Sequence, residues 1–295
     1  MKKITQENSY ELINKLIPSC IFLRFKKLSV YKKIKTSAHK YLPSKYVSSW
    51  NTIKSGLLKG VKLYVDPSGA WQKEMLNGTY DDFFINYMEK YNVADKIVFD
   101  IGAHVGYSAL CFAKMVGKGG HVYTFEPNAA NIYRIKMITK MNPELSERIT
   151  LVEKAVAEKT GRVDFIFGKT IEDGSSSGSF VDTADTISEK AAFERSRGFE
   201  RANVEMTSID NEVSNNRTNI PYMIKIDIEG AEHLALQGAA VTLKTARPII
   251  LLEVHSILNM LNVCKILQTN NYDVNLLKEE PDGRCFLVAE PIRSL

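Results

Sequence analysis

The chain has 295 residues, of which 44% are hydrophobic and 25% are charged, with a formal net charge of +5 at pH 7. These values exclude a disordered or collagen-like chain and are sufficient for one large buried core. No apolar run reaches the length of a membrane-spanning helix, and the first residues lack the apolar segment of a signal peptide. The four cysteines are scattered without C-x-x-C spacing, so we expect reduced thiols and a cytoplasmic protein.

Positive charge is concentrated at the start of the chain. Residues 1–60 contain 13 Lys and Arg, whereas Glu7 and Glu11 are their only acidic residues, and the remainder of the chain is mildly acidic. The apolar pattern of residues 9–40 predicts two short amphipathic helices separated by Pro18. A basic helical extension is therefore expected ahead of the main domain.

We expect this N-terminal extension to cover residues 1–59 and the main domain to cover residues 60–295. The extension either packs its apolar face on the main domain or on a second copy of the chain, which would make a homo-oligomer, or it contacts an anionic membrane surface or a polyanionic glycolipid. In that second case basic residues 24–45 would lie at the inner membrane face. No nucleic-acid-binding module accompanies the charges, so nucleic acid is not an expected partner.

Two elements are predicted between the extension and the centre of the chain. Residues 61–66 show a strand pattern that Pro67 ends. Residues 69–91 are expected to be helical and are rich in aromatic residues. Most of these rings are expected in the core, with one or two bordering a ligand cavity: Trp71, Tyr80, Phe83, Phe84, Tyr87 and Tyr91.

Residues 97–127 carry the most informative pattern in the chain. An apolar run ends in Asp100, a turn containing Gly102 and Gly106 leads into an apolar-periodic helix, and a second apolar run ends in Glu126. This is a βαβ unit with an acidic residue at the carboxyl end of each strand. Glycine turns let backbone N–H groups approach a ligand at a helix N-terminus, and an acid after the second strand can bind both hydroxyls of a ribose. The unit therefore predicts a site for an adenosine-type cofactor.

The spacing of the turn distinguishes between cofactors. It is D-x-G-x-x-x-G, and Ala103 and His104 stand where the diphosphate of a dinucleotide needs glycine. Asp100 adds a negative charge that suits the ammonium or sulfonium of S-adenosyl-L-methionine better than an anion. We therefore predict this methyl donor, with S-adenosyl-L-homocysteine as its product, over NAD or a turn without a ligand. Gly102, Ala103, His104 and Gly106 are expected to lie under its methionine and ribose.

The middle of the chain predicts further elements. A helix is expected over residues 127–140, followed by a strand over residues 149–156 that forms a hairpin with residues 163–167. Residues 168–179, GKTIEDGSSSGS, form either a loose connection or a mobile lid near the site. A polar helix and a short strand are then expected over residues 182–200 and 204–209.

The last third of the chain continues the alternation. It predicts strands over residues 223–228 and 248–255, a helix over residues 257–268, and a hairpin of residues 272–277 with 284–289. The first of these strands has Asp227 near its end, and the second ends in Glu253 and His255. Strands that alternate with helices predict an α/β fold with a doubly wound, mostly parallel seven-stranded sheet, and the hairpin adds one antiparallel strand at its end.

Three segments then narrow the family: FDIGAHVGYSA (residues 99–109), FEPN (125–128) and IKIDIEGAEHLALQGA (224–239), followed by PIILLEVH. Together they resemble the FkbM-type methyltransferases over roughly residues 60–290. The resemblance implies the Rossmann-like class I methyltransferase fold and transfer of a methyl group from S-adenosyl-L-methionine to oxygen, commonly a hydroxyl of a sugar or a polyketide-like product. The family usually has Asn where this chain has His104, so hydrogen bonds at the methionine end are expected to differ.

The strand ends supply the remaining cofactor contacts. Glu126 is the expected ligand of the ribose hydroxyls, with Pro127 beside it. Ala155, at the end of the third strand, is expected to border the adenine. Asp227, at the end of the fourth, is expected next to the methyl group, and Asp100 is expected to favour the donor's ammonium directly or through water.

Transfer to a hydroxyl requires a general base, because an alcohol is a poor nucleophile until it loses its proton. We favour His255 or Glu229 as this base and Asp227 as the group that orients it. Glu229 has an alternative role as a cap of the following helix, and Glu232 and His233 are expected on the surface.

No metal site is predicted. The carboxylates of Asp227, Glu229 and Glu253 can nevertheless gather a divalent cation that lowers the pKa of the acceptor, so this alternative stays open.

The expected function is therefore O-methylation of a hydroxyl on a sugar or glycan, a glycolipid or a secondary metabolite. N-methylation and a nicotinamide-dependent oxidoreductase are the enzymatic alternatives. A non-catalytic scaffold with the same fold is the third, and the cluster of acids at the strand ends argues against it. The sequence does not identify the acceptor.

Overall fold

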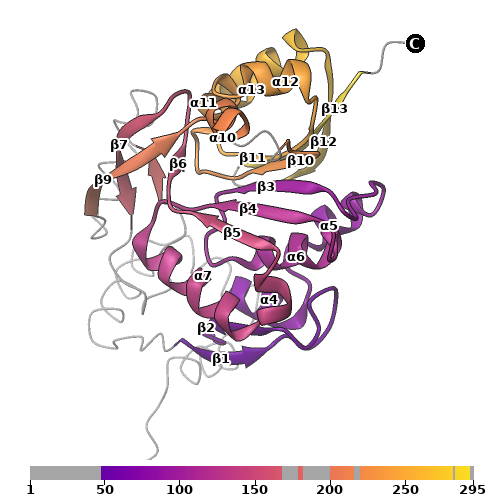
Figure 1. The fold of residues 1–295 in the computed structure, drawn as a ribbon, viewed down its shortest axis with the longest axis vertical. Helices are drawn as coiled ribbons and strands as arrows, with labels where there is room; N and C mark the ends of the chain where they lie inside the picture. The colour runs from indigo at the N-terminus through magenta and orange to yellow at the C-terminus, as the bar shows by residue number, and fades with distance from the viewer. Residues whose placement is uncertain (1–47, 168–178, 182–199, 216–219, 282, 293–295) are drawn as a thin grey trace, which may run out of the picture. The chain divides into compact units, whose positions relative to one another are not determined.

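The computed structural model divides the chain into two compact units, residues 1–46 and 47–295, and the second is described here. The structure describes residues 48–167, 179–181, 200–215, 220–281 and 283–292 (Figure 1). The predicted helices of the N-terminal extension, its basic residues 24–45, most of the 168–179 segment and the polar helix of residues 182–200 lie outside these ranges.

The described part begins with an antiparallel pair, β1 (Ser49–Thr52) and β2 (Lys62–Val65). Ile53 and Leu58, in the connection between them, are buried in the core. Residues 49–58 were expected in the extension, and the structure packs them with the main domain.

The helical segment predicted for residues 69–91 is formed by two helices, α4 (Ala70–Asn77) and α5 (Asp82–Met88), with a turn between them. Gly78 ends α4 in the left-handed conformation, with φ of 71°, and its N–H bonds back to the carbonyl of Met75. A Cβ at this glycine would lie 2.0 Å from the carbonyl oxygen of Ser55, so the turn also depends on the missing side chain.

A seven-stranded sheet is the centre of the fold and confirms the predicted doubly wound α/β architecture (Figure 1). Its order is β12-β13-β11-β10-β3-β4-β5, and β13 runs in the opposite direction to the other six strands. The antiparallel strand was expected at the end of the sheet, but it lies one position in from the edge. The strands are β3 (Ile97–Ile101), β4 (His121–Phe125), β5 (Ile149–Val152), β10 (Met223–Ile226), β11 (Ile249–Val254), β12 (Tyr272–Glu279) and β13 (Cys285–Pro291).

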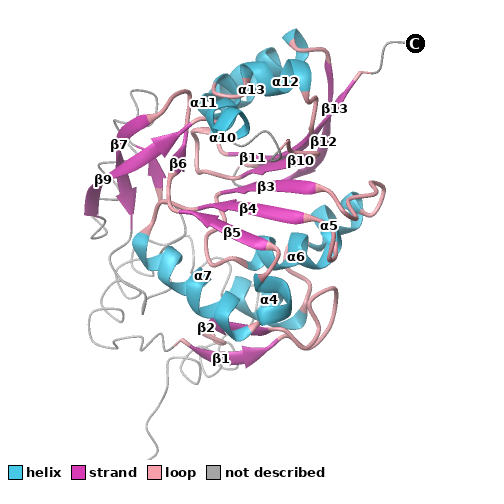
Figure 2. Cartoon of the chain, in the orientation of Figure 1, coloured by secondary structure: helices cyan, strands magenta, loops and turns pink. Residues whose placement is uncertain are grey.

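Helices cover both faces of this sheet, as Figure 2 shows. One face carries α6 (Tyr107–Val116), α7 (Ala129–Met141) and α8 (Pro143–Ser146), together with α4 and α5. The other carries α10 (Ile209–Asn215), α11 (Glu232–Gln237), α12 (Ala240–Thr245) and α13 (Ile257–Thr269). No helix in the described part of the chain is both long enough and apolar enough to cross a membrane.

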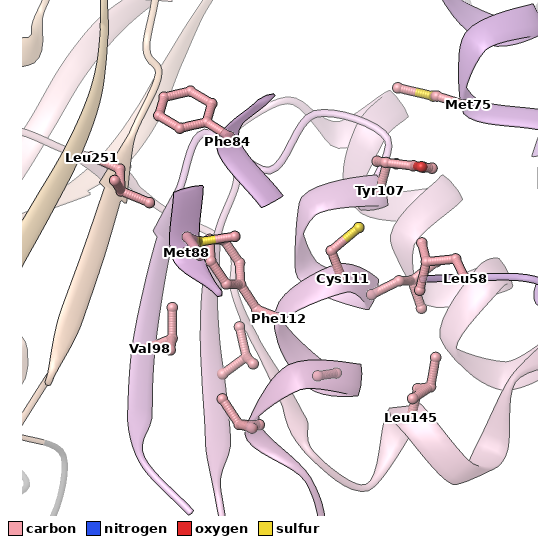
Figure 3. Close-up of a cluster of buried hydrophobic side chains, with 14 of the residues drawn as sticks. Leu58, Met75, Phe84, Met88, Val98, Tyr107, Cys111, Phe112, Leu145 and Leu251 are labelled. Carbon is pink, nitrogen blue, oxygen red and sulfur yellow. The ribbon is translucent and has the colours of Figure 1, made fainter. Parts of the chain in front are cut away.

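Alternation along the strands divides the core into two clusters. Val98 and Leu251 pack on the α6 side with Phe112, as Figure 3 shows, whereas the adjacent residues Phe99 and Ile250 pack on the α11–α13 side. Successive side chains of a strand point to opposite faces, so a strand covered on both faces reads as a continuous apolar run.

A second sheet, of order β6-β9-β7-β8, corrects the predicted hairpin. Its strands are β6 (Ala155–Val156), β7 (Gly161–Phe167), β8 (Phe180–Val181) and β9 (Glu200–Thr207). The strand predicted over residues 149–156 divides at Glu153 into β5 and β6, and β7 pairs with β9 instead of with it. Ala155 therefore lies in the second sheet and not at the end of the third strand of the first.

The chain reverses its direction across the sheet between β3 and β10, which lie side by side at its centre. Gly102 follows β3 with φ of 82°, and a Cβ at this position would lie 1.8 Å from the carbonyl oxygen of Asp227, which follows β10. Only glycine permits this approach of the two strand ends. In open α/β sheets, ligands bind in the crevice at such a reversal.

We predict that Gly102→Ala lowers the free energy of unfolding by about 2–5 kcal/mol, because left-handed strain and a backbone clash add together. Urea denaturation of the purified protein measures this loss. Gly117→Ala is the matched control, since Gly117 also has a positive φ, of 68°, but has nothing within 4 Å of a new Cβ. It should lose only the strain component, about 1–3 kcal/mol, without the clash. Equal losses in the two variants would contradict the clash.

Candidate active site

A cavity of about 980 Å³ opens at the carboxyl ends of β3, β4, β10 and β11. The turn between α4 and α5 and the β12–β13 hairpin complete its walls. Eight of the predicted site residues line it: Gly102, His104, Glu126, Pro127, Ala155, Asp227, Glu229 and His255. Asp100, Ala103 and Gly106 do not line it, and they shape the turn from below.

Glu126 lies at one end of the cavity, buried just after β4. Its Oε2 accepts a hydrogen bond from the N–H of His104 at 2.8 Å, and its Oε1 accepts one from the N–H of Asn128 at 2.9 Å. Burial raises the pKa of Glu126 to about 7, although these hydrogen bonds act in the opposite direction. The side chain of Asn131 also hydrogen-bonds this carboxylate, which has about four lone-pair sites, so acceptor capacity remains for a ligand hydroxyl.

The turn between β3 and α6 is held by backbone hydrogen bonds. The N–H groups of Gly102 and Ala103 both donate to the carbonyl of Phe125, and the N–H of Gly106 donates to that of Ala103. His104 adopts a left-handed φ of 52°, which His and Asn tolerate better than most residues. Its ring lies 5.2 Å from that of Trp71, between centroids.

His104 is electrically neutral in this turn. Burial, aided by the positive charge of Arg134, lowers the pKa of His104 to about 4. The imidazole therefore adds a polar ring to the cavity wall without a positive charge.

Asp100 is fully buried and lies directly opposite Lys225 in the β3–β10 register. Its Oδ2 accepts a hydrogen bond from Ser108 at 2.8 Å, and its Oδ1 lies 3.7 Å from the ammonium of Lys225. The Lys225 ammonium also donates to the carbonyl of Gly102 at 2.9 Å and lies 3.4 Å from Asp227 Oδ2. Asp100 thus organises the turn from within the protein.

Sequence reasoning missed Lys225. The signal was present, because Lys225 is the one charged residue in the otherwise apolar strand Met223–Ile226. Burial acts to lower its pKa, but the carboxylates of Asp227 and Asp100 outweigh burial and hold the pKa above its usual range. The ammonium therefore stays charged.

A second polar cluster surrounds His255, just after β11, at the other side of the cavity. Nδ1 of His255 lies 2.9 Å from Glu232 Oε1. Its Nε2 lies 3.5 Å from Glu229 Oε2, 3.7 Å from Glu253 Oε1 and 3.8 Å from Asp227 Oδ1. Burial acts to lower the pKa of His255, but the surrounding carboxylates, Glu232 first, raise it to about 9.

The expectation that Glu232 and His233 lie on the surface is wrong. Both are buried, because the first turn of α11 packs against α13. Glu232 accepts hydrogen bonds from the N–H of Gly230 at 3.0 Å and from Asn259, and it also holds His255. Glu229 does not cap α11, whose N-cap is Ala231, and instead lines the cavity.

The cavity contains further charges that sequence reasoning did not assign. Asp81 lies in the turn that interrupts the predicted helix, and burial and the nearby Asp227 raise its pKa to about 6. Arg284, from the β12–β13 hairpin, donates to Glu253 Oε1 at 2.5 Å. Burial and Asp227 raise the pKa of Glu253 to about 8 despite this pair.

These residues fit a nucleoside methyl donor. Gly102 and Glu126 both line the cavity: a larger residue at 102 would clash with the end of β10, and an ionised Glu126 supplies a charged acceptor for a ribose hydroxyl. When bound there, S-adenosyl-L-methionine supplies a methyl group activated by a sulfonium.

Comparison with known proteins agrees with this assignment. The profile of the methyltransferase FkbM domain matches residues 100–274. No curated protein matches the chain.

Solved structures with detectable similarity include three methyltransferases. The FkbM methyltransferase of Methylobacillus flagellatus KT is 21% identical, with a TM-score of 0.47, and the match covers 68% of this chain and 44% of that protein. The precorrin-6y C5,15-methyltransferase of Geobacter metallireducens GS-15 is 12% identical, with a TM-score of 0.46 and coverages of 77% and 96%. A SAM-dependent O-methyltransferase of Thermotoga maritima is 11% identical, with a TM-score of 0.45 and coverages of 79% and 76%.

We predict that Glu126→Ala raises the dissociation constant of S-adenosyl-L-homocysteine at least ~100-fold, because two charge-assisted hydrogen bonds are lost. Isothermal titration calorimetry measures this constant. Glu205→Gln, which changes an exposed carboxylate on β9, should bind like the unaltered protein. Undiminished binding by Glu126→Ala would remove Glu126 from the site.

The same carboxylate predicts a pH dependence of binding. Because the pKa of Glu126 is about 7 and its ionised form accepts the hydroxyls, affinity should be constant above pH 8 and fall up to about tenfold per pH unit below pH 7. Titrations between pH 5 and pH 9 test this. The dependence should disappear in Glu126→Gln, and a profile that persists in that variant would assign it to another group.

Proposed function

Because the chain belongs to the FkbM family of methyltransferases, we propose that it methylates a hydroxyl oxygen of a sugar or glycan, a glycolipid or a hydroxylated secondary metabolite, with S-adenosyl-L-methionine as donor. The observation that carries this proposal is the pair formed by Glu229 Oε2 and His255 Nε2, 3.5 Å apart on the wall of the cavity that also contains Glu126. A proton acceptor thus lies in the same cavity as the residues proposed to bind the methyl donor.

We assign the general base to Glu229. Its carboxylate lies on the cavity wall, and its backbone φ of 58° holds it just beyond the end of β10. The acceptor hydroxyl loses its proton to this carboxylate, and its oxygen bonds to the methyl carbon while the electron pair of the carbon–sulfur bond stays on sulfur. His255 is a positioning residue, because Glu232 fixes its ring and its Nε2 faces Glu229.

The aromatic rings of the cavity wall favour a methyl acceptor that has both apolar surface and hydroxyl groups. Trp71, Tyr80, Phe83 and Phe286 line the cavity beside its acids. Rings that supply contact area, combined with a few polar groups that fix orientation, are typical of small-molecule sites.

N-methylation is the second candidate, and the surplus of carboxylates favours it. Acidic side chains on the cavity wall outnumber the basic ones, and they would attract a cationic amine: Glu74, Asp81, Asp82, Asp227, Glu229, Glu253 and Glu280. A screen of hydroxylated sugars, hydroxylated natural products and amines, read out as S-adenosyl-L-homocysteine formation and methylated product by mass spectrometry, separates the two. No turnover with any acceptor would favour the scaffold alternative.

We predict that Glu229→Gln lowers kcat at least ~100-fold on the acceptor found, while the dissociation constant of S-adenosyl-L-homocysteine changes less than about twofold. Loss of the proton acceptor affects the chemical step and not the nucleoside end of the cavity. Asp82→Asn is the matched control, because Asp82 is an exposed acid of the same cavity, and it should keep its kcat. Full activity of Glu229→Gln would contradict the assignment of the base.

A further inference from the structure

The imidazole of His255 is held by a carboxylate on one side and faces three more on the other. Its side chain is 7% exposed, and its Nδ1 is held by Glu232. Its Nε2 has no hydrogen-bond partner among the described residues, although three carboxylates surround it. This nitrogen is thus directed at carboxylate oxygens that lie 3.5–3.8 Å away, within ion-pair distance but beyond a short hydrogen bond.

The spacing of these atoms is wider than a hydrogen bond and a few tenths of an ångström wider than that of ligands around a shared ion. Nitrogen–oxygen hydrogen bonds measure about 2.7–3.2 Å, whereas two atoms bound at about 2.1 Å to one cation lie roughly 3.0–3.4 Å apart. Nε2 of His255 lies 3.7 Å from Glu253 Oε1 and 3.8 Å from Asp227 Oδ1. One ligand atom from each of these three residues lies within 4.8 Å of the others, so a small contraction would enclose an ion.

The support behind the imidazole also matches that of a metal ligand. A histidine that binds metal through one ring nitrogen commonly donates the other N–H to a carboxylate, which fixes the tautomer and the ring orientation. Glu232, which is 0% exposed, occupies that position, and the N–H of Gly230 and the amide of Asn259 fix it in turn. This leaves Nε2 as the nitrogen that faces the cavity.

We propose that Asp227, Glu253 and His255 bind a divalent cation that holds the acceptor's hydroxyl group, a role that rests on the function proposed above. One imidazole nitrogen and carboxylate oxygens suit Mn²⁺ or Mg²⁺, and open coordination positions would face the cavity. A hydroxyl bound to the cation loses its proton more readily, and that proton passes to Glu229. The cation binds and polarises the acceptor, and it is neither oxidised nor reduced.

Two positively charged side chains of the protein, Lys225 and Arg284, also contact the proposed ligands Asp227 and Glu253. Lys225 lies 3.4 Å from Asp227 Oδ2, which leaves Oδ1 directed at His255. Arg284 contacts Glu253 Oε1, the oxygen that also faces His255, and its side chain is 40% exposed. Arg284 therefore competes with the cation for Glu253, so its removal should favour cation binding.

Mn²⁺ alone is the probe, added to the full chain in the presence of S-adenosyl-L-homocysteine and followed by calorimetry and by loss of the free-ion electron paramagnetic resonance signal. We expect one saturable site. Asp227→Asn, Glu253→Gln and His255→Asn should each weaken it at least ~10-fold, and Glu232→Gln, which is outside the cavity, roughly 10–100-fold. Arg284→Gln should bind Mn²⁺ as tightly or more tightly, and Asp82→Asn and Glu229→Gln should be within about threefold of the unaltered protein.

Three results would overturn the cation site: no saturable binding, equal losses in Asp82→Asn and His255→Asn, or full methylation activity in excess EDTA. S-adenosyl-L-homocysteine binding by each variant shows that it has folded. Mn²⁺ binding without turnover on any acceptor would instead count against the proposed function and leave the site intact, so the two proposals fail separately.

Discussion

The ammonium of Lys225 is the interaction on which the rest of the site depends. It lies between the neighbouring strands β3 and β10, a boundary called the seam below. There it contacts three groups at the strand ends: Asp100, the carbonyl of Gly102 and Asp227. Buried charges are stable only when they are paired and hydrogen-bonded, so each member of this set requires the others. The seam thereby fixes where the glycine turn stands relative to the end of β10.

That seam also explains why the two polar clusters face a single cavity. The chain leaves β3 toward β4 and β5, then returns to place β10 and β11 on the other side. Glu126 follows a strand on one side, and His255 follows a strand on the other. A nucleoside held near Glu126 would therefore present its far end toward His255, which is the arrangement that transfer between two substrates requires.

Much of the fold was predictable, because the main sheet is buried on both faces and its strands read as apolar runs that end in acids. The βαβ unit of residues 97–125, the parallel direction of most strands and the terminal hairpin all follow from that pattern. The second sheet could not be predicted from this pattern, because β6 and β8 have two residues each and pair with strands that lie far along the chain. Short strands carry too little periodicity to predict a partner.

Within the site, the sequence predicted which residues gather at the strand ends, but not which of them line the cavity and which are buried behind its wall. Glu126, Asp227, Glu229 and His255 line the cavity as their positions after strands indicated. Asp100 is also an acid near the end of a strand, but it is fully buried beneath the turn, because Lys225 lies opposite it on the neighbouring strand.

The side of a short helix is equally hard to assign. Glu232 is an acidic residue in the first turn of a helix, a position that is usually exposed, but the packing of α11 on α13 buries it behind His255. Charge alone does not tell an exposed carboxylate from one that orients a neighbour, because the difference lies in tertiary packing.

The position of β13 has a consequence for how the protein is made. Because β13 lies between β11 and β12 but follows both in the chain, β11 keeps an open hydrogen-bonding edge while the ribosome is still adding residues. Such an edge is a template for pairing with other chains. The hairpin that covers this edge also carries Arg284 into the cavity, so one segment both pairs with β11, leaving β12 as the edge strand, and adds a charge to the cavity wall.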